Sequence, residues 1–545
     1  MDVIQRAIEK NYQISDRDEL NQQTWEQFQK ACCGKKIFMF GIGEAASYFV
    51  FNYHKDIQLD GIVDNDKSKQ GFGVGEFMAE AINTEYENLI VMDTSILSNY
   101  KLEEVIVLIT NTRCYMPIVE QLEQIGITSC YLLVMMEANK RKNLEEVCIQ
   151  DKEVIKEDYI EECCKQGIER KKIIISIGYY GNHGKYITEQ LLKHGITLDI
   201  VWIVKDLTLK YPKGVRLIYE NNWKKYIYEM ETAHIWIYDI ALPMYIKKRP
   251  GQIYIQTKHW SSITLKKFFL DDISTTGTIE EINRIKYNGE MMDYIFSGSK
   301  FDEETCKSGF AFKGEFVRVG SARTDALFRP ENRKKVYEKY NLGENIRCAL
   351  YAPTFRFIKA EKRKFFDTKL DFKGLKKVLE KRFGGEWIIL LRMHPSIRKE
   401  SKKVNKGTYV IDVSEYDDCQ ELVAASDITI SDYSSIMFEH AFVNKPVFLF
   451  TTDRIQYVDK ERELLIKYDE LPFPIAESNE ELRKNIINFV QEEYEENLSK
   501  FKNRFGIHED GYASERAAKF IISLIEIKER ESDCEEYNSI DSYIK

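Results

Sequence analysis

Residues 431–450 read SDYSSIMFEHAFVNKPVFLF and combine the signals of a strand end, a turn and a helix. Serine hydroxyls and the N–H groups that open a helix both donate hydrogen bonds to anions. A second loop, LLRMHPS at 390–396, places His394 directly after another apolar run. Ligands of open α/β sheets bind beyond the carboxyl ends of the parallel strands. The two loops together therefore predict a phosphate-handling site.

The composition limits the class of protein. At 545 residues the chain exceeds what one core usually holds, so several domains are expected. The net charge of −9 gives no reason to expect nucleic acid as a partner. The eleven cysteines lack metal-binding spacings, and no signal-peptide pattern opens the chain, which indicates a reducing cytoplasm. No apolar run approaches the roughly 20 residues that span a bilayer, so any membrane contact is expected to be peripheral.

The first 150 residues are predicted to form a Rossmann-like domain. KKIFMFGIGEAASYF at 35–49 has the pattern of a strand, a glycine turn and a helix, with Gly41 and Gly43 in a G-x-G-x-x-A turn. Asp64 ends the next apolar run, 21 residues after Gly43 (64 − 43 = 21), where an acidic residue meets a ribose in dinucleotide folds. The turn predicts a nucleotide site at Gly41, Gly43 and Asp64. The alternative is a turn that has no ligand.

The rest of the chain has the pattern of two further α/β units. Residues 151–170 are charged and are expected to form a helical connector. Residues 171–340 and 341–530 each alternate strands with helices, and 531–545 lacks apolar periodicity and is expected to be flexible. Two adjacent doubly wound units are the pattern of a GT-B architecture, with the active site in the cleft between them.

Five ordered motifs carry a more specific resemblance. They are YIQTKHWSSITLKKF at 254–268, VGSARTDALF at 319–328, LYAPTFR at 350–356, RMHPS at 392–396 and the stretch at 431–450. In this order the chain resembles the CDP-glycerol glycerophosphotransferases, the teichoic-acid polymerases and primases, over about residues 170–530. The resemblance implies a GT-B fold, a CDP-glycerol or related CDP-polyol donor, and peripheral attachment to the inner face of the membrane.

His259 is the candidate general base. Histidine suits proton abstraction near neutral pH, and the resemblance gives this role to the histidine of a His-Gly-Thr-type motif at the same place. Here Trp260, Ser261 and Ser262 follow instead, and the bulky Trp260 is expected to narrow the acceptor site or to alter acceptor choice. The alternative for His259 is an ordinary hydrogen bond at a strand end.

The donor is expected to be held by His394 and by hydroxyl and charged side chains around it. His394 would act as a second catalytic residue that stabilises the charge left on CMP. Substrate-binding roles are predicted for Arg323, Asp325, Thr354, Arg356, Arg392, Ser434, Ser435 and Glu439. A structural Arg323–Asp325 pair is the alternative for those two residues, and a metal-independent reaction is expected.

The predicted function is transfer of glycerol phosphate from CDP-glycerol to a lipid-linked polyol-phosphate or glycan, with release of CMP. No cofactor is required for this chemistry. The basic and aromatic segments at 247–250, 265–269 and 359–366 predict contact with anionic lipid, or else solvated helix faces. The alternatives are a CDP-ribitol transferase, a nucleotide-sugar glycosyltransferase, and a nucleotide-binding regulatory protein that works through its N-terminal glycine turn.

Overall fold

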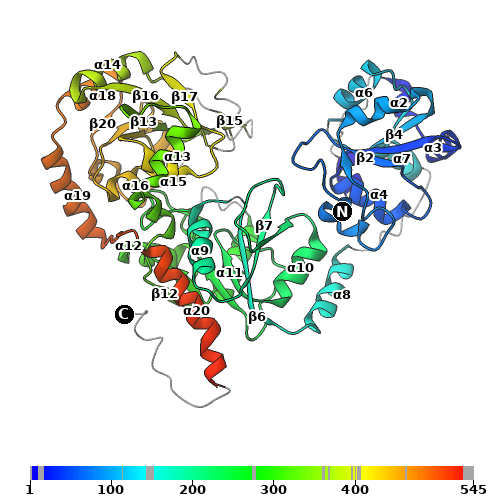
Figure 1. The fold of residues 1–545 in the computed structure, drawn as a ribbon, viewed down its shortest axis with the longest axis horizontal. Helices are drawn as coiled ribbons and strands as arrows, with labels where there is room; N and C mark the ends of the chain where they lie inside the picture. The colour runs from blue at the N-terminus through cyan, green and yellow to red at the C-terminus, as the bar shows by residue number, and fades with distance from the viewer. Residues whose placement is uncertain are drawn as a thin grey trace. The chain divides into compact units, whose positions relative to one another are not determined.

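The computed structural model describes residues 3–9, 17–112, 114–142, 152–178, 180–272, 278–358, 363–365, 369–394, 397–398, 401, 407–460 and 463–531. The chain divides into two compact units (Figure 1). The first comprises Met1–Gly167, Val201–Lys210 and Arg216–Thr232, and the second comprises Ile168–Ile200, Tyr211–Val215 and Ala233–Lys545.

The first unit is built on a five-stranded sheet in the order β3-β2-β1-β4-β5. Its strands are β1 (Lys36–Phe40), β2 (Gly61–Val63), β3 (Val91–Met92), β4 (Val105–Ile109) and β5 (Cys130–Leu132). Strand β1 pairs in parallel with β2 and with β4. Successive side chains of β1 enter different cores, since Ile37 and Met39 belong to one apolar cluster and Phe38 and Phe40 to another. Burial on both faces explains why these strands are continuous apolar runs.

The helices of this unit lie before, between and after its strands in sequence. They are α1 (Val3–Glu9), α2 (Asp18–Asn21), α3 (Trp25–Cys32), α4 (Glu44–Tyr53), α5 (Val74–Phe77), α6 (Tyr115–Gln124), α7 (Leu133–Lys142), α8 (Lys152–Cys164) and α10 (Trp223–Thr232). Thr24 caps α3 in a capping box, in which its side chain accepts from the N–H of Gln27 and the Gln27 side chain accepts from the Thr24 N–H.

A second sheet has seven strands in the order β12-β11-β10-β9-β6-β7-β8. They are β6 (Glu169–Gly178), β7 (Asp199–Val204), β8 (Val215–Tyr219), β9 (Ala233–Tyr238), β10 (Ile253–Gln256), β11 (Tyr294–Phe296) and β12 (Glu315–Val317). Strand β9 pairs in parallel with β6 and β10, and β11 pairs in parallel with β10 and β12. The carboxyl ends of β9 and β10 therefore lie next to each other, and the loop that carries His259 follows β10.

The third sheet has six strands in the order β17-β16-β13-β18-β19-β20. They are β13 (Ile346–Ala352), β16 (Glu386–Leu391), β17 (Val410–Asp412), β18 (Ile428–Ser431), β19 (Val447–Phe450) and β20 (Ile475–Ala476), and β14 (Arg356–Ile358) pairs antiparallel with β15 (Arg363–Phe365). The apolar core of this sheet contains Tyr351, Ile389 and Ile430 from adjacent strands. Parallel pairing brings the loops after β13, β16 and β18 to one edge.

The helices of the second unit complete the layers around these sheets (Figure 1). They are α9 (Asn182–Lys193), α11 (Ile279–Met291), α12 (Lys300–Gly309), α13 (Glu331–Lys339), α14 (Phe372–Phe383), α15 (Cys419–Ala425), α16 (Ile436–Phe442), α17 (Arg454–Lys460), α18 (Asn479–Ile487), α19 (Gln491–Phe505) and α20 (Ala513–Glu531), with the 3₁₀ segment η5 (Ala322–Phe328). Among the described helices, none combines the length and the apolar character that crossing a bilayer requires. Most of the basic segment at 359–366, and the tail beyond Glu531, lie outside the described residues.

Candidate active site

The loop after β10 presents His259 from an otherwise buried segment. From 257 to 265 every residue is buried except His259, whose side chain is exposed. Protein nevertheless surrounds the ring closely, and this desolvation, together with the positive charge of Arg323, lowers the pKa of His259 to about 4. A hydrogen bond to the backbone of Asp239 acts in the opposite direction. The imidazole is therefore neutral near pH 7 and able to accept a proton.

Arg323 connects the His259 loop to two other segments. Its Nη1 donates to the carbonyl oxygen of His259 at 2.7 Å and to Oδ1 of Asn182 at 2.9 Å. Its Nε lies 2.9 Å from Oε1 of Glu439 on α16 in an ion pair whose side chains are 12% and 2% exposed. A phosphate contact by Arg323 would compete with these three partners. In the structure the side chain instead holds the His259 loop, Asn182 and Glu439 together.

Asp325 and Glu439 are occupied inside the protein. Asp325 is fully buried and accepts from the N–H groups of Ala513 and Ser514, at 3.1 and 2.7 Å, which fixes the start of α20. Glu439 pairs with Arg323 and accepts from Nε2 of Gln420 at 3.1 Å. Both carboxylates are buried and already hydrogen-bonded. The structure therefore does not favour the substrate contacts predicted for Asp325 and Glu439.

The turn between β18 and α16 places Ser434 and Ser435 beside the His259 loop. Both residues are partly exposed, and Oγ of Ser435 lies 3.1 Å from Oγ1 of Thr264. Beneath the turn, Oδ1 of Asp432 accepts from the N–H and the Oγ1 of Thr354, at 2.8 and 2.6 Å. Thr354 thus supports the turn, and the two serines remain the hydroxyls that are accessible to a ligand.

Arg356 is held within the third sheet's loops. Its Nε and Nη2 donate to the two oxygens of Asp453 at 2.6 and 3.0 Å, and its Nη1 donates to Asp432 at 3.0 Å. The guanidinium also lies 5.0 Å from the ring centres of Tyr433 and Tyr457. Because two carboxylates already pair with this cation, the structure does not favour the phosphate contact predicted for Arg356.

The loop after β16 carries two predicted site residues, Arg392 and His394, whose surroundings differ. Arg392 donates through Nη1 to the carbonyl oxygens of Val413 and Tyr416, at 3.2 and 2.5 Å. His394 is exposed, and its ring centre lies 4.8 Å from that of Phe355. Of the two residues predicted from this loop, His394 is the one positioned to meet a ligand.

A scan against family models matches residues 163–523 to the CDP-glycerol:poly(glycerophosphate) glycerophosphotransferases. The chain belongs to this family. The resemblance inferred from the five motifs is therefore confirmed.

The relatives include teichoic-acid enzymes. The chain is 30% identical over 351 residues to a teichoic acid poly(glycerol phosphate) polymerase of Staphylococcus epidermidis, covering 62% of this chain and 48% of the relative. It is 27% identical to a teichoic acid glycerol-phosphate transferase of Staphylococcus aureus, covering 63% of this chain and 90% of that relative. The chain thus spans about half the length of the first of these relatives.

Solved structures of the wall teichoic acid polymerase TagF resemble the fold of this chain. One matches with a TM-score of 0.60 and 28% identity, covering 68% of this chain and 94% of that chain. Another, a variant soaked with CDPG, matches with a TM-score of 0.60 and 27% identity, over 69% of this chain and 94% of that one. The prediction of a mixed α/β, GT-B-like fold with parallel sheets is confirmed at this level.

The glycerophosphotransferase motif around His259 departs from its expected form at the residues that follow the histidine, Trp260, Ser261 and Ser262. Trp260 is 6% exposed and packs its ring 4.5 Å from Phe268 and 6.2 Å from Phe310. Its Nε1 donates to Oδ1 of Asp302 at 3.3 Å. The Trp260 ring thus packs into an aromatic core, and its centre also lies 4.8 Å from that of the His259 ring. A narrowed acceptor site or a changed choice of acceptor stays a prediction for Trp260.

Sequence reasoning did not identify Asp239, which ends the apolar run of β9. Its Oδ2 accepts from Nδ2 of Asn182 at 3.2 Å, and burial raises the pKa of Asp239 to about 7 against the effects of that hydrogen bond and of Arg323. Asn182 has a φ of +54°, a conformation that is uncommon outside glycine. Its position directly after a buried strand is the feature of the sequence from which Asp239 could have been predicted as a site residue. Lys185, on the helix that Asn182 begins, is buried in ion pairs with Asp418 and Glu421.

In the glycine turn of the first unit, the predicted residue Asp64 is hydrogen-bonded to the turn itself. Oδ2 of Asp64 accepts from the N–H of Ile42 inside the turn at 2.9 Å, and Lys69 Nζ lies 3.5 Å from the same oxygen. Gly41, at φ +97°, allows the turn, and Gly43 precedes α4, whose first residue Glu44 forms an exposed ion pair with Arg6. The residues predicted to bind a nucleotide instead close the turn on itself.

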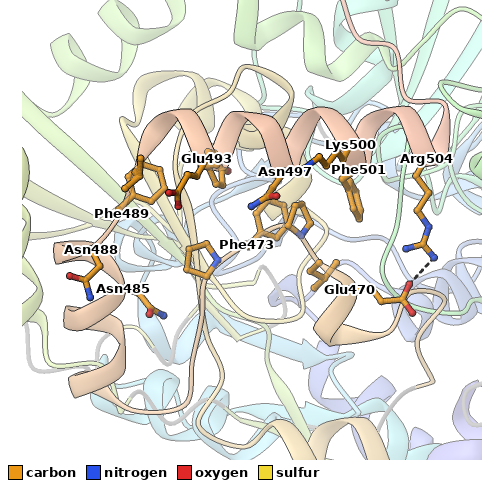
Figure 2. A pocket seen from close by; sticks show the side chains of 15 residues that line it. Glu470, Phe473, Asn485, Asn488, Phe489, Glu493, Asn497, Lys500, Phe501 and Arg504 are labelled. Atoms are coloured by element: carbon orange, nitrogen blue, oxygen red, sulfur yellow. Dashed lines mark ion pairs between the residues drawn. The ribbon is translucent and has the colours of Figure 1, made fainter.

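A cavity of about 640 Å³ lies elsewhere in the second unit (Figure 2). The loop at 470–474 and helices α18 and α19 line it, and Arg504 pairs with Glu470 at its rim. None of the predicted site residues lines this cavity. Within the described parts of the chain, no group of three or more His, Cys, Asp or Glu side chains is arranged to hold a metal ion.

Proposed function

We propose that the chain transfers glycerol phosphate from CDP-glycerol to a hydroxyl of a lipid-linked acceptor and releases CMP. The product would extend a teichoic-acid-like or capsular polymer. The family membership and the names of the glycerol-phosphate relatives support this donor. Ribitol-phosphate enzymes also occur among the relatives, such as a teichoic acid poly(ribitol-phosphate) polymerase of Bacillus spizizenii at 29% identity, so CDP-ribitol is the second candidate donor.

The reaction requires one proton acceptor and support for the leaving phosphate. The acceptor oxygen forms a bond to the phosphorus that carries the glycerol, the bond to the bridging oxygen breaks, and CMP leaves with the electron pair. The acceptor's proton passes to His259. Hydroxyls of Ser434 and Ser435 and the ring of His394 donate to the pyrophosphate oxygens, where negative charge increases as CMP leaves.

The observation that carries the proposal is the contact between Thr264 and Ser435. Thr264 lies five residues after His259 (264 − 259 = 5) on the same buried loop, and its hydroxyl lies 3.1 Å from that of Ser435. The base and the serine turn therefore belong to adjoining segments, as a base and a phosphate site must for in-line transfer.

The low pKa of His259 is compatible with this role. Burial of the ring and the neighbouring cation Arg323 lower this pKa, and two negatively charged donor phosphates beside the ring would raise it again. The ring thus remains neutral before the donor binds and becomes a stronger base in the complex. This sequence of events favours proton transfer only when substrate is present.

The remaining assignments complete the proposal. We assign residues 1–150 to a Rossmann-like N-terminal domain, 151–170 to a connector, and 171–340 and 341–530 to the acceptor-side and donor-side halves of a GT-B pair. The enzyme would act at the inner face of the cell membrane, held there by anionic lipid around its basic segments. The parallel strand order β3-β2-β1-β4-β5 supports the first assignment.

The test is CMP release by purified protein with a lipid-linked acceptor and a panel of CDP-glycerol, CDP-ribitol and UDP-sugars. CDP-glycerol is expected to give the highest kcat/KM, and product sizing separates single addition from polymerisation. Preference for CDP-ribitol would move the assignment to the second candidate. Release from UDP-sugars alone, or from no donor, would refute the proposal.

A further inference from the structure

The exposed His259 is flanked by two fixed points on its own loop. On one side, Lys258 is 1% exposed at a φ of +63°, donates to the carbonyl oxygen of Phe296 at 2.9 Å, and pairs with the buried carboxylate of Asp302. A non-glycine residue in this conformation is maintained only where its surroundings fix it. The ion pair and the aromatic packing of Trp260 therefore hold the loop immediately around His259.

On the other side, Ser262 is held by contacts from three segments. Its hydroxyl hydrogen-bonds to the carboxylate of Glu509 and lies 3.0 Å from Oγ of Ser321, while its carbonyl oxygen accepts from Oγ of Ser299 at 2.6 Å. The packing leaves no space, because a Cβ on Gly298 would lie 1.7 Å from the Ser262 hydroxyl oxygen. A side chain at Gly298 would displace the loop.

Glu509 links this loop to the segment that carries Arg323. Its Oε2 accepts from the N–H of Ser321 at 3.2 Å and from Oγ1 of Thr324 at 2.7 Å. Ser321 and Thr324 flank Arg323, whose guanidinium donates to the carbonyl oxygen of His259. One carboxylate therefore joins both segments that contact the histidine.

Glu509 reaches this position from a distant part of the chain. It lies between α19 and α20, 247 residues after Ser262, where the chain returns from the third sheet's helices to the second sheet's loops. Glu509 is partly buried, and desolvation raises the pKa of its carboxyl to about 7. Its hydrogen bonds to hydroxyls and an N–H offset part of the free-energy cost of removing a carboxylate from water. Removing this carboxylate alone would leave the N–H of Ser321 and the hydroxyls of Ser262 and Thr324 without this acceptor.

We propose that Glu509 is a positioning residue of the transferase, which fixes the His259 loop against the Arg323 segment so that the imidazole alone projects to the acceptor. The proposal rests on the proposed function, in which His259 is the base. It predicts that Glu509 affects the chemical step more than donor binding, because the serine turn and His394 belong to other loops.

The experiment compares Glu509→Gln and Glu509→Ala with the control Asp510→Asn, which weakens the neighbouring pair with Arg516. The Gln variant retains the volume but cannot accept all of the hydrogen bonds that converge on the carboxylate. We expect its kcat to fall about tenfold to a hundredfold, as small misplacements of reacting groups do, with KM for CDP-glycerol nearly unchanged. Asp510→Asn should leave both constants near the wild-type values.

A second readout does not depend on catalysis. Diethyl pyrocarbonate acylates accessible neutral imidazoles, and peptide mass mapping gives the rate at His259 relative to the exposed His394 in the same sample. We expect this ratio to rise in Glu509→Gln and to stay constant in Asp510→Asn. An unchanged ratio together with an unchanged kcat would overturn the proposal, and so would equal losses in both variants. If wild-type protein releases no CMP, the proposed function fails while the modification ratio still decides the positioning role.

Discussion

The ion pair between Arg323 and Glu439 gives the most quantitative prediction. The Nε and Oε1 atoms lie 2.9 Å apart, and the side chains are 12% and 2% exposed. Replacing Arg323 by Met leaves the Glu439 carboxylate buried without this cation, while the hydrogen bond from Gln420 is retained. Removing one partner of a buried pair costs about 3–5 kcal/mol, mainly because the other charge stays uncompensated. The variant Arg323→Met should therefore lose about this much unfolding free energy.

The assay is a double-mutant cycle with Arg323→Met, Glu439→Gln and the double variant, followed by urea denaturation. Because the Gln side chain needs no cation, the double variant should recover about half of the loss or more. Arg318→Met is the control, since its pair with Glu303 has an arginine that is 57% exposed and should contribute at most about 1 kcal/mol.

The same substitution should change the titration of His259. Arg323 lowers the pKa of that imidazole, so its removal should raise the value above about 4, and an NMR titration of the histidine measures it. Purely additive losses in the cycle, combined with an unchanged pKa of His259, would refute this account of Arg323.

Three further predictions follow from single side chains. The acid limb of kcat/KM, which reports the free enzyme, should lie near the low pKa of His259 of about 4. The acid limb of kcat should lie at higher pH, because the bound phosphates raise the pKa of His259. Both limbs are measured in pH–rate profiles, and limbs at the same pH would contradict this effect of the phosphates. Asp325→Ala should lower the free energy of unfolding by about 1–3 kcal/mol, because it leaves the buried N–H groups at the start of α20 unpaired. KM for the donor should stay constant. A raised KM at unchanged stability would instead indicate that Asp325 binds substrate. Calorimetry with NAD should detect no binding to the wild-type protein or to Asp64→Ala, because the Asp64 carboxylate is hydrogen-bonded to the turn. Binding to the wild-type protein that is lost in the variant would support the alternative of a nucleotide-binding regulatory protein.

The order of the sheets and the loops that face a ligand could be predicted from the sequence. Apolar runs that end in polar loops located His259, His394, Ser434 and Ser435, because parallel strands collect such loops at one edge. Of these four residues, the two histidines are exposed and the two serines are partly exposed. Local patterns suffice here, since each signal lies within a few residues of its strand.

The roles of the charged residues could not be predicted in this way. Arg323 and Arg356 were expected to bind phosphate, but their partners Glu439 and Asp453 lie 116 and 97 residues away (439 − 323 = 116; 453 − 356 = 97). Sequence reveals that a cation is present and not which carboxylate neutralises it. Glu509 carried no signal, because its segment follows a helix rather than a strand and meets Ser262 only through the tertiary fold.

The glycine turn of the first unit illustrates the opposite case. Gly41, Gly43 and Asp64 have the spacing of a dinucleotide fingerprint, and the chain does form the strand, turn and helix that the spacing predicts. The ligand does not follow from the fold, because the Asp64 carboxylate bonds to the turn itself.

The central claim is that His259 accepts the proton in a CDP-polyol transfer. The most direct measurement is CMP release from CDP-glycerol by wild-type protein, by His259→Ala, and by the control His194→Ala, which changes an exposed histidine at the end of α9. We predict a loss of about a hundredfold or more in kcat for His259→Ala, the scale of general-base catalysis, and wild-type release by the control. CMP release by His259→Ala at the wild-type rate would contradict the account.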